Sequence, residues 1–181
     1  MINPTLITCA VRNFVLKSGK KTKLMHEEIL TDQELAMVTS IAATRTAVAR
    51  GANVKDAKMG KKSGLQYDID GFIGEYAFCK WKNIFLDLIP SPRSGSYDCL
   101  IKGKRIDVKT TRHQKGRLVA VLKDNPDVDT YVLAIIDENI VRFPGYAHKE
   151  DLCQKENIKN LGHGDGYALD QDQLKKFKQD G

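Results

Sequence analysis

The sequence predicts an α/β fold in which a central mixed β-sheet is flanked by α-helices. Helix patterns cover about residues 32–50 and 71–82, a β-hairpin pattern covers 97–110, and a β-branched apolar run follows at 129–136. Helical and strand periods therefore alternate along one chain. We expect all 181 residues to form a single domain whose core spans about 31–145, with an N-terminal strand and a C-terminal helix added to it.

The first helix has a defined start and end. Thr31 and Glu34 stand at the two positions of a capping box, and Gly51 is placed to end the helix. Apolar residues recur between them at helical spacing, which predicts one buried stripe. These residues are Leu35, Val38, Ile41, Ala42 and Val48.

The second helix is apolar on nearly all sides, which predicts burial on more than one face. Glu75 is the exception in its middle. On a helical wheel Glu75 shares a side with Gly71 and Cys79, two small residues that leave room for another element to approach. Glu75 is therefore either a ligand or an ordinary carboxylate that faces solvent or is paired.

Shorter patterns predict the remaining elements. Turn residues bound the run at 129–136, and its composition is typical of a central buried strand. Asp170 and Gln173 predict the cap of the C-terminal helix. Further strands are expected at about 6–15, 83–88, 117–122, 140–143 and, as an edge segment, 167–169, and a short helix is expected at 149–155.

The hairpin is the most informative segment of the chain. Lys102-Gly103 suits a two-residue turn, and this turn pairs Asp98 directly with Asp107. Side-chain alternation then separates a polar face from an apolar face. The polar face holds Ser96, Asp98, Asp107 and Lys109, and the apolar face holds Tyr97, Cys99, Ile101, Ile106, Val108 and Thr110.

Two carboxylates opposed in this way repel each other, because directly paired Cβ atoms lie only about 5 Å apart. A compensating cation is therefore expected beside them. Glu75, Asp98 and Asp107 offer only oxygen ligands, which suit Mg²⁺ or Mn²⁺ rather than zinc or copper.

The helix acid, the strand Asp and the following Asp-Val-Lys together resemble the PD-(D/E)XK nuclease superfamily. Glu75 matches its helix acid within a Gly-x-x-Gly-Glu-x-Ala segment, Asp98 its motif Asp, Asp107 its (D/E) and Lys109 its Lys; Tyr97 departs from the nominal Pro. The resemblance spans about 71–136. It implies a restriction-endonuclease-like core, catalysis by these four residues, and metal ligation by Glu75, Asp98, Asp107 and the Val108 carbonyl.

Positive charge is concentrated beside these acids. Between residues 102 and 117 seven Lys or Arg residues accompany one acid, in a chain with a net charge of +6. Such a stripe is suited to nucleic-acid phosphates, although it is equally consistent with a solvated basic face. The residues expected to touch DNA are Arg105, Thr111, Arg112, Lys115 and Arg117.

We therefore expect a Mg²⁺- or Mn²⁺-dependent deoxyribonuclease, most simply an endonuclease. The alternative is a nucleic-acid-binding module that keeps the fold without catalysis. A homodimer would suit cutting both strands of a duplex. No apolar run approaches the roughly 20 residues that cross a membrane, no leader is evident, and the four cysteines lack zinc spacing, so we expect a cytoplasmic protein with reduced thiols.

Overall fold

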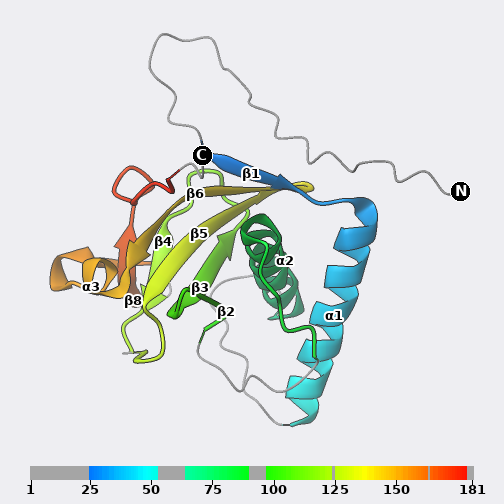
Figure 1. Cartoon of the computed structure of the whole chain (residues 1–181). Coiled ribbons are helices and arrows are strands. Elements are labelled where there is room, and N and C mark those ends of the chain that lie inside the picture. Colours follow the sequence, from blue (N-terminus) through cyan, green and yellow to red (C-terminus); the bar gives the residue numbers. More distant parts are fainter. Residues whose placement is uncertain (1–24, 53–63, 90–96, 124, 163, 179–181) are drawn as a thin grey trace, which may run out of the picture.

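A computed structural model shows a curled five-stranded mixed sheet, with two long helices on one face and a small three-stranded sheet on the other (Figure 1). The structure describes residues 25–52, 64–89, 97–123, 125–162 and 164–178. The first part of the chain contains β1 (His26–Ile29), α1 (Asp32–Gly51), α2 (Gly64–Lys82), β2 (Cys99–Ile101), β3 (Lys104–Thr111) and β4 (Leu118–Val121). The second part contains β5 (Thr130–Asp137), β6 (Ile140–His148), α3 (Lys149–Leu152), a 3-10 turn (Lys155–Asn157), β7 (Ile158–Asn160) and β8 (Asp165–Leu169).

The large sheet has the strand order β1-β6-β5-β3-β2, and the small sheet has the order β4-β8-β7. Strands β3 and β5 run parallel, and every other pair in the large sheet is antiparallel. The first seven residues of β5 are buried, which confirms the predicted central strand. A long apolar run at this place fits a strand that is covered on both faces.

Alternate residues of β5 point into two separate cores. Val132, Ala134 and Ile136 pack with the residues of α1 and α2. Tyr131, Leu133 and Ile135 pack on the other side with residues of β4, α3 and β8. The second core, which the sequence did not predict, covers the sheet face that carries Asp107.

The predicted hairpin is confirmed in its turn and register. Lys102 and Gly103 both have positive φ values, 48° and 78°, as a tight two-residue turn requires. Cys99 pairs with Ile106, so Asp98 and Asp107 belong to the same predicted register. Ser96 lies outside the described residues. The prediction that the polar face of the hairpin is open to solvent is wrong for Asp107, which is only 7% exposed.

Helix α1 has the predicted limits and capping box. Helix α2 begins at Gly64, earlier than the predicted start at Gly71. The extra turns carry Asp68 and Asp70, which accept hydrogen bonds from Thr46 and Gln66 respectively. These contacts join the start of α2 to α1 and to its own first turn, so the helix continues through a stretch that looks like a loop in the sequence.

Other predicted elements differ from the structure. Residues 83–88 form no strand, since Asn83 has φ 50° and turns the chain out of α2. The strand beginning at Ile140 runs on to His148, and β8 is the middle strand of its sheet rather than an edge. The predicted strand at 6–15 lies outside the described residues.

The expected C-terminal helix is wrong for the described residues from 170 to 178. The predicted cap contact does form, because the Asp170 N–H donates to the Gln173 side chain at 2.8 Å. The chain then pairs with β6 instead of coiling: Lys175 and Tyr146 exchange two backbone hydrogen bonds of 2.9 Å. A pairing partner far along the chain has therefore overridden a local helix pattern.

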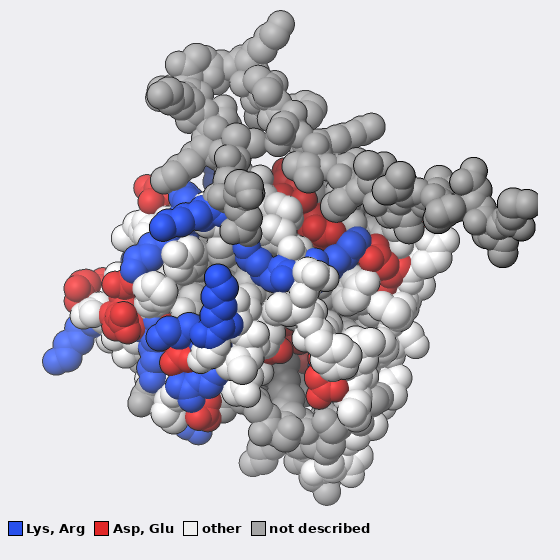
Figure 2. Space-filling model, in the orientation of Figure 1, with Lys and Arg blue, Asp and Glu red and all other residues white. Residues whose placement is uncertain are grey.

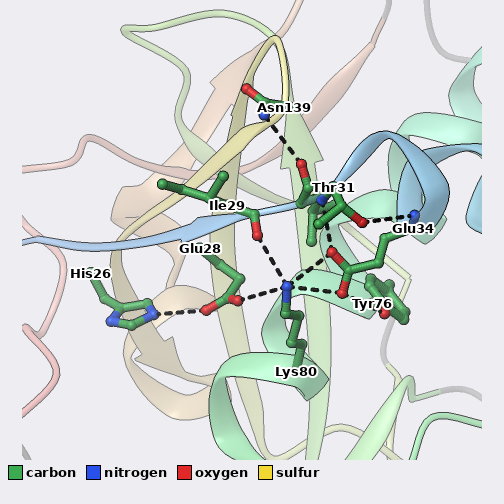
Figure 3. Close-up of polar contacts among 9 residues, drawn as sticks. His26, Glu28, Ile29, Thr31, Glu34, Tyr76, Lys80 and Asn139 are labelled. Carbon is green, nitrogen blue, oxygen red and sulfur yellow. Dashed lines mark hydrogen bonds and ion pairs between the residues drawn. The ribbon is translucent and has the colours of Figure 1, made fainter. Parts of the chain in front are cut away.

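A polar network fixes the far end of α2 (Figure 3). The Lys80 ammonium reaches Glu34 at the start of α1 (2.8 Å), Glu28 on β1 (3.2 Å) and the Ile29 carbonyl (3.0 Å). The Tyr76 hydroxyl also donates to Glu34, at 3.0 Å. Three elements are thereby tied together about one turn beyond Glu75.

Candidate active site

The close approach of α2 to β3 places Glu75. A Cβ atom built on Gly74 would lie 2.1 Å from Thr110 Oγ1 and 3.1 Å from Thr110 Cβ, so only a glycine permits this separation. Gly74 and Thr110 are the direct neighbours of Glu75 and Lys109. The contact therefore sets the distance between the part of α2 that carries Glu75 and the part of β3 that carries Lys109.

Asp98 is fixed at the edge of the sheet by two backbone contacts. Its N–H donates to the Ile106 carbonyl at 2.8 Å, which extends the hairpin ladder by one residue. Its carboxylate accepts from the Val108 N–H at 2.7 Å. The side chain consequently bends over β3 between Asp107 and Lys109.

Glu75 and Asp107 both act on the Asp98 carboxyl. Burial, followed by the negative charges of Glu75 and Asp107, raises the pKa of Asp98 well above its usual range. The Val108 N–H and Lys109 oppose the increase without cancelling it. The structure thus brings Glu75 and Asp107 each within electrostatic reach of Asp98, and their repulsion favours a proton or another cation on the Asp98 carboxyl.

Lys109 is the nearest compensating charge. Its ammonium lies 2.8 Å from Asp107 Oδ2, and its side chain is 39% exposed. The ammonium also lies 5.9 Å from the centre of the Tyr131 ring. Lys109 therefore bridges the buried Asp107 and the surface, where a substrate can reach it.

The acids do not form a ready-made metal site in this arrangement. Across the described ranges, no three His, Cys, Asp or Glu side chains are grouped closely enough to hold a metal ion. The Asp98 carboxylate instead accepts from Val108, and Asp107 contacts Lys109. The oxygen donors suit Mg²⁺ or Mn²⁺ chemically, but a bound ion would have to replace these contacts.

Two buried thiols lie close in sequence to Glu75 and Asp98. Cys79 follows Glu75 by one turn of α2, and Cys99 follows Asp98 in β2. The hydrogen bond between the thiols, together with burial, raises the pKa of Cys99. Both cysteines are free and less than 7% exposed, so they pack in the contact between α2 and β2.

The arginines predicted to contact DNA form ion pairs with carboxylates of the protein. Arg105 holds Asp129 through its backbone N–H (2.8 Å) and its guanidinium (2.9 Å). This pairing lowers the pKa of Asp129. Arg117 lies against Asp170 at 2.6 Å.

The other three residues predicted to contact DNA, Arg112, Thr111 and Lys115, differ in their contacts. Arg112 contacts Asp70 of α2 at 2.8 Å, and Asp70 is only 4% exposed. Thr111 accepts from the His113 N–H at 3.1 Å, whereas Lys115 is exposed. Asp70 could not be predicted as a partner from the sequence, because Asp70 and Arg112 are 42 residues apart.

Comparisons with known proteins return no relative for this chain. No family model, no curated protein and no solved structure matches it. Among the described helices, none has the length and apolar character needed to cross a membrane.

Proposed function

We propose that the chain is a metal-dependent nuclease that hydrolyses DNA phosphodiester bonds, most simply an endonuclease, on a restriction-endonuclease-like core. The observation that supports this proposal is the hairpin register, which sets Asp98 opposite Asp107, with the Lys109 ammonium 2.8 Å from Asp107. Burial, followed by the charges of Glu75 and Asp107, also raises the pKa of Asp98, and perturbed carboxyls with specific charged neighbours are typical of catalytic sites.

The proposed roles follow from the position of each group. Glu75, Asp98, Asp107 and the Val108 carbonyl would hold Mg²⁺ or Mn²⁺. A bound ion of this kind acidifies a water molecule and stabilises charge on phosphate oxygens. Lys109, which contacts Asp107 at 2.8 Å, would orient the attacking water or hold the phosphate if Asp107 were to ligate the metal.

The test is cleavage of linear, circular, single-stranded and branched DNA with Mg²⁺, with Mn²⁺ and with EDTA. Wild type should cut only with metal, and Asp107→Ala and Lys109→Ala should each slow cleavage by on the order of 10²-fold or more. The exposed Asp172→Ala is the matched control and should cut like wild type. Full activity of either hairpin variant contradicts the proposed roles.

A second candidate is a DNA-binding module without catalysis, which the absence of a grouped metal site in the described part of the chain favours. Thermal melts separate the two. For the nuclease, Mg²⁺ or Mn²⁺ should raise the melting temperature of wild type more than that of Asp98→Asn, because metal relieves the repulsion among the acids. For the binding module, both proteins should respond only to ionic strength.

The homodimer is tested separately. Size-exclusion chromatography of the protein with and without duplex DNA measures whether it elutes with the mass of one chain or of two.

A further inference from the structure

A cavity of about 790 Å³ lies where the first residues of β3 and β5, the end of β6, α3 and β8 come together. Its volume is in the range of pockets that hold nucleotide-sized ligands. It is separate from the acids, since none of Glu75, Asp98 and Asp107 lines it. The lining residues that matter here are Lys104, Lys123, Asp129, His148, Lys149 and Tyr167.

Three lysines line the wall of the cavity. Lys104 and Lys123 are exposed, and neither forms an ion pair with any residue that the structure describes. Lys149 donates to the Asn125 carbonyl at 2.9 Å. The lining also contains two acids: Asp129 is held by Arg105, and Glu150 is exposed. Figure 2 shows Lys and Arg side chains, with Asp and Glu side chains among them, over this part of the molecule.

The cavity also has an aromatic surface. Tyr167 stands on the middle strand of the small sheet, opposite Ala120 and Ile158. Its ring is partly buried against the second core, so it is held in place and still lines the cavity. His148 adds a second ring, which is fixed by a 3.1 Å hydrogen bond with Thr130. Fixed rings beside lysines are the arrangement on which single-stranded nucleic acid stacks.

We propose that this cavity binds one unpaired nucleotide of a DNA strand, with its base on Tyr167 and its phosphate between Lys104 and Lys123. The volume of about 790 Å³ is enough for one nucleotide. The proposal rests on the proposed function for the identity of the polymer. Lys104 precedes Asp107 by three residues of β3, or about 10 Å along the strand.

The experiment is fluorescence anisotropy with a labelled 12-nucleotide single strand and the matching duplex, in EDTA so that cleavage plays no part. The Lys104→Ala/Lys123→Ala variant should bind the single strand about tenfold more weakly and lower the salt slope by roughly 1.4 for two lost phosphate contacts. Tyr167→Leu should weaken binding about fivefold or more, while Tyr167→Phe keeps the ring and the affinity. Lys178→Ala, exposed and away from the cavity lining, is the charge-matched control.

Single-strand binding that is equal in wild type, the double lysine variant and Tyr167→Leu would overturn the proposal. Competition by thymidine monophosphate as strong as that by the oligonucleotide would overturn it in favour of a free-nucleotide site. Cleavage assays with Mg²⁺ separate this outcome from failure of the proposed function. A wild type that binds through the cavity but never cuts refutes only the nuclease, and one that cuts while the cavity variants bind normally refutes only the cavity.

Discussion

The Gly74→Ala substitution tests the contact that positions the helix acid. The new Cβ would lie 2.1 Å from Thr110 Oγ1, whereas ordinary contact begins at 3.4 Å, so the atoms must separate by about 1.3 Å. Rotation of Thr110 relieves this only in part, because Thr110 Cβ does not move with the rotation and itself lies at 3.1 Å. Overpacking of this kind costs about 1–3 kcal/mol, and the better helix propensity of Ala returns about 1 kcal/mol.

We therefore expect Gly74→Ala to lower the free energy of unfolding by up to about 2 kcal/mol, measured by urea denaturation. Gly71→Ala is the matched control one turn earlier in the same helix. A Cβ there meets nothing within 4 Å, so this variant should be about 0.5–1 kcal/mol more stable than wild type.

A Thr110→Ala background should remove most of the penalty, since it deletes the hydroxyl and the methyl group that meet the new Cβ. The two substitutions should consequently show a coupling energy of about 1 kcal/mol or more. If Gly74→Ala is as stable as Gly71→Ala in the wild-type background, the close approach of α2 to β3 does not exist and Glu75 is not placed by it.

Two further predictions concern charge. Because the pKa of Asp98 is raised in the folded protein, wild-type stability should fall as pH rises from the unfolded value of about 3.8 through the raised pKa. Asp98→Asn should not show this loss of stability. In EDTA it should be more stable than wild type at pH 8, and the difference should disappear near pH 4. Urea denaturation measures both proteins across this range, and equal pH profiles would contradict the prediction. Burial alone would raise the pKa of Glu34, but hydrogen bonds from Lys80, Thr31 and Tyr76 lower it to about 2. Lys80→Met should therefore cost about 2 kcal/mol at neutral pH, and this cost should shrink as pH falls from 4.5 toward 2; a constant cost across that window would exclude the ion pair as its cause.

The hairpin and the first helix were predictable because their determinants are local. Lys102-Gly103 selects a two-residue turn, and once the turn is fixed, alternation assigns each side chain of β2 and β3 to a face. The capping box of α1 likewise depends on Thr31 and Glu34 alone. Pattern and structure agree wherever neighbouring residues decide the conformation.

Elements that depend on distant partners were missed. The segment after Asp170 has a helix cap in sequence and in structure, yet its backbone pairs with Tyr146 of β6. Strand β1 exists through pairing with β6, more than a hundred residues later in the chain. Local propensity cannot include a partner whose position depends on the completed fold.

The same distinction applies to the candidate site. The grouping of Asp98, Asp107 and Lys109 follows from the hairpin register, so the sequence predicted it. The partners of the basic stripe did not follow from any local rule, since Asp70 and Asp129 come from other elements. A stripe that looks uniform in sequence is divided in the structure into arginines paired with acids of other elements and a lysine, Lys109, paired with Asp107 of its own strand.

This division has a chemical basis. A guanidinium has a rigid, planar set of donors that matches a carboxylate, so arginine is suited to the fixed contacts that Arg105 and Arg112 make between elements. Lysine carries a compact charge on a flexible stem, which can follow a moving or displaced phosphate. Lys104 and Lys123 beside the cavity are of this second kind, as is Lys109 once Asp107 is engaged elsewhere. Arginines therefore hold the scaffold on which the acids meet, and the lysines remain available to a polyanion that approaches them.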